Sequence, residues 1–320
     1  MGWSIRSNEE WVMSNLITTP KHDDLIYDVG MHKGEDTEFY LSKGFRVIAF
    51  EANPELVSLC RVRFKKFICQ GQLKIVEGAI VDMGAIDAGQ KRVRFYKNDQ
   101  ESVWGTVRAN WAQRNLRLGT KTSVIEVDVI NFVEVMRENG IPHFLKIDIE
   151  GVDMVCLNAL SNFQERPDYV SIESDKTSYA NIKHEIDTFI SLGYEHFQAI
   201  EQSAIRLYQS PPEPAREGQY VHRRFEFGSS GLFGAELNDE WKSKKEILRQ
   251  YRAILLGYYL LGDDGILNDW KFRGSSQLQL LASRFCSFLT KAAIPGWYDT
   301  HARHRCVNGR KDQTRLRSCD

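Results

Sequence analysis

The sequence predicts an α/β fold with a mostly parallel, doubly wound sheet. Short apolar runs alternate with helical patterns from residue 24 to about 202, and glycines close several of these segments. Such alternation is typical of parallel strands that are joined by right-handed crossovers, with helices on both faces. At 42% apolar residues the chain can build a sizeable core, which excludes disorder as its main state.

The apolar runs predict six strands for the main sheet, because each is short and bounded by turn or helix-start residues. The first ends in a glycine turn at Gly30, and the second ends in an acid, Glu51. Two further runs, 93–96 and 123–127, predict a small β insertion around Gly105. The six main strands are expected over residues 25–30, 46–51, 73–80, 143–151, 168–173 and 195–201.

Helices are expected between these strands, from apolar stripes of helical period and from residues that favour helix ends. Asn53 and Pro54 mark one start, since Asn caps a helix and Pro suits its first turn. Asp128 is the expected cap of a later helix, which Gly140 ends. The helices are predicted over residues 35–42, 54–67, 129–139, 155–160, 182–190 and 248–255.

Charge and cysteine usage narrow the class of protein. Lys and Arg number 42 against 43 Asp and Glu, so the chain as a whole lacks the basic footprint of a nucleic-acid-binding protein. No apolar run approaches the ~20 residues of a membrane span, and the N-terminus does not resemble a signal peptide. The six cysteines form no C-x-x-C pair, which is typical of reduced thiols and favours the cytoplasm.

The alternation of strand and helix patterns stops after about residue 205, and the composition of the chain changes. Three of the eight prolines fall within 211–214, and a glycine-rich segment follows at 228–234. The last twenty residues carry six Lys or Arg against two Asp, which favours a solvated tail. We therefore predict an N-terminal segment (1–23), a sheet domain (24–205), a C-terminal extension (206–300) and a basic tail (301–320).

The first two strand ends indicate a nucleoside cofactor. Ligands of open parallel sheets bind beyond the carboxyl ends of the strands, and an acid such as Glu51 commonly holds ribose hydroxyls there. The turn Asp28-Val-Gly30-x-x-x-Gly34 lacks the second glycine of a dinucleotide fingerprint, because His32 stands in its place. S-adenosylmethionine carries no pyrophosphate and does not need that glycine, so it fits this turn better than NAD.

The fourth strand carries an unusual row of charges. Lys146, Asp148 and Glu150 lie two residues apart, which places all three on one face of an extended strand. A central parallel strand is normally apolar, and burying an unpaired ion costs several kcal/mol. These charges are therefore expected either to pair with one another or to emerge into a ligand cleft. Glu173, at the end of the fifth strand, adds another acid.

These residues together resemble the FkbM family of S-adenosylmethionine-dependent methyltransferases. The resemblance rests on three strings, each at a strand end: Tyr27-Asp-Val-Gly-Met-His-Lys-Gly-Glu-Asp-Thr-Glu-Phe-Tyr-Leu41, Phe50-Glu-Ala-Asn-Pro54 and Leu145-Lys-Ile-Asp-Ile-Glu-Gly151. It covers about residues 24–202. The segments 228–234 and 296–302 also resemble features of a bacterial subgroup of that family. Many family members read Asn-x-Gly where this chain has His32-Lys33-Gly34.

The resemblance implies a class I, Rossmann-like methyltransferase fold that methylates a hydroxyl of a sugar, glycan or polyketide-type secondary metabolite. Residues 24–205 would bind the cofactor and 206–300 would cap the acceptor side. Asp28, Gly30 and Gly34 would surround the methionine part, Glu51 would take the ribose with Asn53 beside it, and Asp148 would face the reacting end. The cofactor-binding candidates are Asp28, Gly30, Met31, His32, Gly34, Asp36, Thr37, Glu51, Asn53, Ala79, Ile80 and Asp148, with Ala79 and Ile80 at the adenine.

Methyl transfer to an alcohol also requires that the hydroxyl lose its proton, so a general base is expected. Asp148 is the first candidate, followed by Glu150, Glu173 and His32, with Lys146 orienting Asp148 and keeping it ionised. A divalent ion could replace the base by polarising the hydroxyl, although the sequence contains no committed metal motif. The spacing of His301, His304 and Cys306 matches no standard zinc pattern.

Two other functions compete with this interpretation. A nicotinamide-dependent oxidoreductase or epimerase uses the same sheet, but the missing glycine and the lack of a Tyr-x-x-x-Lys pair at the fourth or fifth strand argue against it. A catalytically silent binding module is the other alternative. The charged end of the fourth strand argues against it, because buried charges without a function would only cost stability. The expected partner is a small-molecule or glycan acceptor, not nucleic acid or membrane. The sequence does not indicate an oligomeric state.

Overall fold

The computed structural model describes residues 16–261 and 297–307, apart from 101, 118, 176–177, 204, 206–208 and 227. The chain forms two compact units, residues 1–168 and 169–320. This division falls inside the range 24–205 that we expected as one domain, and the predicted domain ranges remain a prediction. The segments 1–15 and 308–320 lie outside the described residues, as does Gly296 of the segment 296–302.

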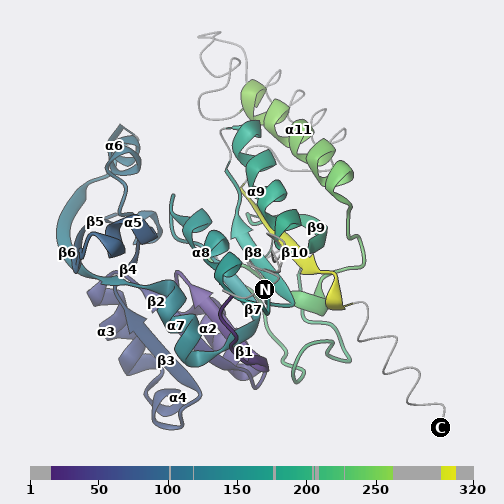
Figure 1. Cartoon of the computed structure of the whole chain (residues 1–320), viewed down its shortest axis with the longest axis horizontal. Coiled ribbons are helices and arrows are strands. Elements are labelled where there is room, and N and C mark those ends of the chain that lie inside the picture. The colour runs from purple at the N-terminus through teal and green to yellow at the C-terminus, as the bar shows by residue number, and fades with distance from the viewer. Residues whose placement is uncertain are drawn as a thin grey trace, which may run out of the picture. The chain divides into compact units, whose positions relative to one another are not determined.

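The first unit contains four parallel strands in the order β3-β2-β1-β7 (Figure 1). Consecutive strands are linked by helices, as the alternation of patterns predicts. The strands are β1 (Lys21–Val29), β2 (Arg46–Glu51), β3 (Leu73–Glu77) and β7 (Ile141–Ile147), and the helices are α2 (Glu35–Ser42), α3 (Pro54–Arg63), α4 (Lys65–Cys69), α7 (Phe132–Asn139) and α8 (Asp153–Ala159). A short 3-10 turn, η2 (Leu160–Asn162), follows α8. The predicted α/β class with a mostly parallel sheet is confirmed.

The predicted β insertion is confirmed as a second, three-stranded sheet with the order β4-β6-β5. Ala79, Phe95 and Val127 form its small core. Its elements are β4 (Ala79–Ile80), α5 (Met83–Asp87), β5 (Arg92–Asn98), η1 (Ser102–Trp104), α6 (Ala109–Arg117) and β6 (Thr122–Ile130). The strand that we expected over 73–80 is therefore two strands, since the chain turns at Gly78, where φ is 138°, and β4 pairs with β6 instead.

Two helix predictions needed correction. Asn131, not Asp128, caps α7: its side chain accepts a hydrogen bond from the Glu134 amide at 3.2 Å. Asp128 lies in β6, opposite Arg92 of β5, so strand pairing decided between two residues that both suit a helix cap. The helix that we expected over 54–67 divides at Phe64 into α3 and α4.

The second unit contains three strands in the order β8-β10-β9, with β10 antiparallel to both neighbours (Figure 1). Its elements are β8 (Tyr169–Glu173), α9 (Tyr179–Ser191), β9 (Tyr194–Glu201), η3 (Gly234–Glu236), α11 (Lys244–Leu261) and β10 (Tyr298–His304). Four residues of β10 belong to the range 301–320 that we expected as a tail. Tyr298 through Ala302 are buried, although the segment reads as polar.

A buried group of hydroxyls joins these strands to the helices, and we call Ser174, Tyr251, Thr300 and Glu185 the hydroxyl cluster. The Tyr251 hydroxyl lies 2.6 Å from Thr300 Oγ1 and 3.0 Å from Ser174 Oγ. Ser174 Oγ also donates to a Glu185 carboxylate oxygen at 3.1 Å. None of the four side chains belongs to an expected site, so this cluster is a structural feature of the second unit. Within the described part of the chain, every helix is too short or too polar to cross a bilayer.

Candidate functional site

The turn between β1 and α2 is tied to the end of β2. The amides of Gly30 and Met31 both donate to the Phe50 carbonyl oxygen, at 3.1 and 2.9 Å, and the Gly34 amide donates to the Met31 carbonyl at 2.9 Å. Gly30 has a φ of 91°, and a Cβ there would fall on the carbonyl oxygen of Asp148. The protein's own packing therefore requires this glycine, whether or not a ligand is bound.

Lys146 lies at the centre of a buried ionic group. Its Nζ is 3.3 Å from Asp28 Oδ1, 3.3 Å from Asp36 Oδ2 and 3.5 Å from Asp148 Oδ2. We call these four residues the lysine cluster. Burial by itself lowers the pKa of Lys146, but the three carboxylates outweigh it and raise that pKa well above its ordinary value. The three carboxylates therefore favour the charged ammonium form of Lys146.

The sequence left open whether the charges after the fourth strand pair with one another or emerge into a cleft. The charges pair, and one of them also reaches outward: Lys146 is 3% exposed, whereas the side chain of Asp148 is 42% exposed. The strand ends at Ile147, so Asp148 and Glu150 lie in the loop after it and not on one strand face. Three carboxylates surround one ammonium, a formal excess of two negative charges.

Thr37 and Asp36 bring the first turn of α2 into this cluster. The Thr37 hydroxyl donates to Asp28 Oδ2 at 2.5 Å, and all three side chains are buried. Lys146 Nζ also donates to the Gly30 carbonyl oxygen at 3.3 Å. The cluster therefore joins β1, β7, α2 and the turn 30–34, which together border the carboxyl end of the sheet in the first unit.

Glu51 ends β2, as expected, and both of its carboxylate oxygens accept backbone hydrogen bonds. The His32 amide donates to Oε2 at 2.9 Å and the Asn53 amide donates to Oε1 at 2.8 Å. Burial raises the pKa of Glu51, against the lowering effect of these hydrogen bonds. Asn53 Oδ1 accepts from the Glu55 amide at 3.0 Å, so the Asn53 side chain caps α3.

His32 adopts a left-handed backbone conformation with a φ of 52°, which is uncommon for a residue with a side chain. Its Nε2 lies 2.7 Å from Ser102 Oγ, and its Nδ1 lies 3.5 Å from Glu35 Oε2. Burial raises the pKa of Glu35, but the interactions with His32 outweigh it, so this pKa is lowered overall. We did not identify Ser102 or Glu35 from the sequence. Glu35, three residues after His32 on the first turn of α2, was the detectable one.

The loop after β7 is held from two sides. The carboxylate of Asp153 accepts hydrogen bonds from the amides of Ile149 and Gly151, at 2.9 and 3.2 Å. Thr106 of the insertion donates to the Glu150 carbonyl at 2.8 Å. A Cβ on Gly151 would lie 2.7 Å from the indole nitrogen of Trp111, so that ring packs on the loop. Asp153 and Thr106 therefore position the segment that carries Asp148, and we did not predict either of them.

The remaining candidates lie elsewhere. Ala79 and Ile80 follow β3, as expected, but their side chains are buried and Ala79 packs in the core of the small sheet. Glu173 ends β8 in the second unit, opposite Asp299 of β10. His301 is fully buried, and burial lowers its pKa to about 3. Among the described residues, no group of three or more His, Cys, Asp or Glu is placed to hold a metal ion.

Residues 28–196 of the chain match the family described as "Methyltransferase FkbM domain". Solved structures to which the chain is similar include a precorrin-6y C5,15-methyltransferase from Geobacter metallireducens GS-15, with 11% identity, coverage of 60% of this chain and 76% of that one, and a TM-score of 0.29. An S-adenosylmethionine-dependent methyltransferase from Archaeoglobus fulgidus has 9% identity, coverage of 92% and 90%, and a TM-score of 0.35.

A third solved structure is an S-adenosylmethionine-dependent methyltransferase from Thiobacillus denitrificans in complex with S-adenosyl-L-homocysteine. It has 9% identity, coverage of 93% of this chain and 92% of that one, and a TM-score of 0.30. No curated protein matches the chain.

Proposed function

The chain belongs to the FkbM methyltransferase domain family and is an S-adenosylmethionine-dependent methyltransferase, and we propose that it methylates a hydroxyl oxygen of a sugar, glycan or polyketide-type secondary metabolite. The observation that carries the proposal is Asp148, a partly exposed carboxylate held by a buried ammonium. Hydroxyl acceptors need a base, whereas the sulfonium already activates the methyl group. A carboxylate at this edge of the sheet supplies such a base.

The residues present fit the cofactor. When bound, S-adenosylmethionine supplies a methyl group on a positively charged sulfur, and its α-amino group carries a second positive charge. The lysine cluster has an excess of two negative charges beside the turn 30–34, so it favours such a ligand. Glu51, a partly buried carboxylate at the end of β2, suits a pair of ribose hydroxyls.

The candidates divide into residues that would touch the cofactor and residues that would act through charge. Asp28 and Asp36 are 0% and 3% exposed and already pair with Lys146, so their role is to hold that ammonium and to set the local field. Thr37 holds Asp28 in turn. We assign direct contact to the turn 30–34 (Gly30, Met31, His32, Gly34), to Glu51 and to the exposed part of Asp148. Asn53, Ala79 and Ile80 would border the nucleoside through backbone atoms.

Asp148 is the base in this proposal, and it accepts the proton that the acceptor hydroxyl loses. Lys146 is a positioning residue, because its ammonium at 3.5 Å favours the ionised carboxylate. Glu150 and Glu173 remain alternatives of the same chemistry. His32 is a second candidate base, since its Nε2 lies 2.7 Å from Ser102 Oγ and its Nδ1 lies 3.5 Å from a Glu35 carboxylate oxygen. The expected compartment is the cytoplasm, in line with free Cys60, Cys69, Cys156 and Cys306.

The first experiment is thermal unfolding of the protein with S-adenosylmethionine, S-adenosylhomocysteine, NAD and NADP. A ligand at a hundred times its dissociation constant stabilises the fold by about 2.7 kcal/mol, which raises the midpoint by roughly 5 to 10 °C. We expect this shift with the two adenosyl-sulfur compounds alone. A shift with NAD or NADP alone would point to the oxidoreductase alternative.

The second experiment is transfer of isotopically labelled methyl to a panel of hydroxylated acceptors, with variants of the two bases. Asp148→Asn should lower kcat by about 10²- to 10⁴-fold while S-adenosylhomocysteine affinity changes by a few-fold at most. Glu150→Gln, the same chemical change two residues away, should retain most of the turnover. Loss of turnover there and not in Asp148→Asn would transfer the role of base to Glu150. Loss of turnover in His32→Gln but not in Asp148→Asn would transfer the role of base to His32.

A further inference from the structure

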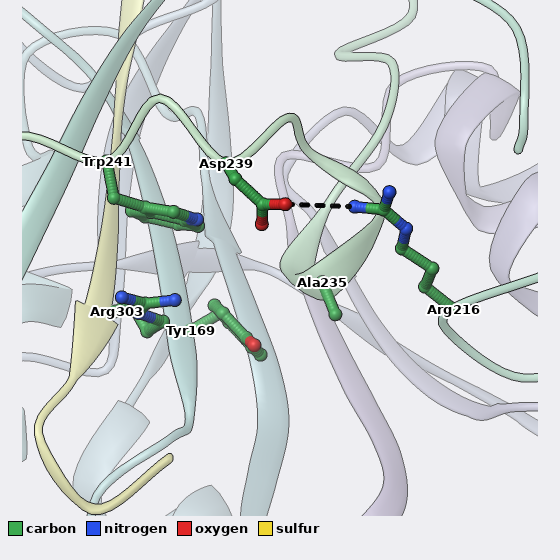
Figure 2. A pocket seen from close by; sticks show the side chains of 6 residues that line it. All are labelled: Tyr169, Arg216, Ala235, Asp239, Trp241 and Arg303. Atoms are coloured by element: carbon green, nitrogen blue, oxygen red, sulfur yellow. Dashed lines mark ion pairs between the residues drawn. The ribbon is translucent and has the colours of Figure 1, made fainter. Parts of the chain in front are cut away.

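A cavity of about 240 Å³ lies within the second unit and takes no part in the proposed function. Six residues line it: Tyr169, Arg216, Ala235, Asp239, Trp241 and Arg303 (Figure 2). Tyr169 begins β8 and pairs with Arg303 of β10, whereas Glu173 ends β8. The cavity is therefore at the amino end of β8. Cofactors and acceptors of open α/β sheets bind at the carboxyl ends, so this cavity is a separate feature.

The Arg303 guanidinium lies over the ring of Trp241 in this cavity. Its guanidinium lies 4.8 Å from the centroid of the Trp241 ring, and the rings of Trp241 and Tyr169 are 6.1 Å apart (Figure 2). Burial lowers the pKa of Arg303, against the raising effect of Tyr169 and Asp239. Its Nε is buried and has no hydrogen-bond partner among the described residues. A buried donor without a partner is costly, which marks the Arg303 guanidinium as incompletely paired.

The second guanidinium in the cavity is weakly paired. Arg216 lies 4.0 Å from Asp239, at side-chain exposures of 50% and 89%, and such exposed pairs contribute little. Figure 2 shows the Asp239 carboxylate pointing toward Arg216. Two guanidinium groups therefore share one carboxylate, which leaves a formal charge of +1 in the cavity. Guanidinium groups bind carboxylates and phosphates through paired N–H donors.

We propose that this cavity is a binding site for the phosphate or carboxylate group of a small organic anion. The guanidinium groups of Arg303 and Arg216 donate to the oxyanion, and Arg216 exchanges its weak contact with Asp239 for the ligand. The volume is below the ~300–1,000 Å³ of drug-sized pockets, so the ligand is about the size of a single sugar ring. The edges of Tyr169 and Trp241 provide apolar contact for that ring, and exposed Asp239 can accept its hydroxyls.

The test is calorimetric titration of the full chain with glucose 6-phosphate, glucuronate, inorganic phosphate and neutral glucose, at constant ionic strength in chloride. We expect binding by one or more of the three anions and none by glucose. Stronger binding of glucose 6-phosphate identifies a phosphate monoester, and stronger binding of glucuronate identifies a sugar carboxylate. Binding of glucose as tight as that of both sugar anions, or no binding by any anion at millimolar concentration, would overturn the proposal.

Variants separate this site from other cationic surfaces. Arg216→Gln and Arg303→Gln should each weaken anion binding by about tenfold or more, because each removes a charge-assisted contact. Arg305→Gln, an exposed arginine just after β10, is the matched control and should bind as the parent does. Arg216 is half exposed, so its variant tests the site even if Arg303→Gln unfolds. Anion binding that Arg216→Gln leaves unchanged contradicts the assignment. S-adenosylhomocysteine titration reports the proposed function separately.

Discussion

The lysine cluster of the first unit and the hydroxyl cluster of the second unit both connect sheet strands to helices, but with different chemistry. In the first, one ammonium contacts three carboxylates at 3.3 to 3.5 Å. In the second, three hydroxyls lie 2.5 to 3.0 Å from one another beside a carboxylate. Burying ions costs several kcal/mol each, whereas paired hydroxyls are inexpensive to bury. A hydroxyl cluster is therefore sufficient where the buried polar groups only hold strands and helices together.

Exposure explains the difference. Ser174, Tyr251 and Thr300 are all below 5% exposed, so the hydroxyl cluster is closed. The lysine cluster is buried except at Asp148, whose side chain is 42% exposed. Ions are therefore retained where one member of the group reaches the surface at the carboxyl end of the strands, and neutral groups are used where none does. This contrast supports a functional role for the first cluster and a structural role for the second.

The largest expected effect is that of removing the ammonium. Lys146→Met leaves Asp28 and Asp36 buried without their cation, which should lower the free energy of unfolding by about 3–5 kcal/mol. Urea denaturation measures this loss. Lys74→Met, an exposed lysine on β3, should stay within about 0.5 kcal/mol of the parent. A loss below about 1 kcal/mol in Lys146→Met would show that the ionic cluster contributes no more than a surface pair.

The backbone beneath the lysine cluster gives the next effect. Gly30→Ala combines a left-handed φ with a Cβ on the Asp148 carbonyl oxygen, and should cost about 3 kcal/mol. Gly71→Ala is the matched control, because φ is 71° there but nothing among the described residues lies within 4 Å of the added Cβ. Its expected cost is about 1–2 kcal/mol. Equal losses in urea would show that the close approach to Asp148 is not tight.

A third group of charges, around Asp168 in the first unit, should make the free energy of unfolding depend on pH. Burial raises the pKa of Asp168, but its contacts with His143 at 2.9 Å and Lys21 at 2.5 Å outweigh this and lower it to about 2. The folded pKa is below the unfolded one, so the stabilisation is full above about pH 4 and is lost as the pH falls toward 2.

Asp168→Asn removes that acid dependence. The difference in unfolding free energy between parent and variant should fall by about 2.5 kcal/mol from pH 5 to below pH 2, because each pKa unit corresponds to about 1.36 kcal/mol. Denaturation curves at several pH values measure it. Asp24→Asn, which breaks the more exposed pair with Arg46, should change much less over the same range. A pH-independent difference for Asp168→Asn would mean that its pKa is not lowered in the folded chain.

The smallest effect belongs to the hydroxyl cluster. Tyr251→Phe removes one hydroxyl and leaves Ser174 and Thr300 with each other, so we expect a loss of about 1 kcal/mol. Tyr259→Phe, on the exposed face of α11, should change the unfolding free energy by less than about 0.5 kcal/mol. A loss in Tyr251→Phe as large as that in Lys146→Met would remove the energetic distinction between the two clusters.

Local signals determined much of the first unit. The helix 35–42 and the strand 46–51 have the predicted bounds, because an apolar pattern and clear end residues act within a few positions of each other. Glu51 and the turn at Gly30 could be placed for the same reason. The cofactor class followed from them, since the motif and the acid lie at successive strand ends.

Tertiary structure alone decided the contacts between residues that are far apart in the chain. Lys146 meets Asp28 across 118 positions, and His32 meets Ser102 across 70. Strand pairing, not the capping preference of Asp128, determined where α7 begins. β10 joins the sheet between β8 and β9 although its sequence reads as a polar tail, because neighbouring strands supply the hydrogen bonds and burial that a local pattern cannot reveal. The positions of the strand-end motifs could therefore be predicted from local patterns, while the charge partners that give those motifs their chemistry depend on packing between distant segments.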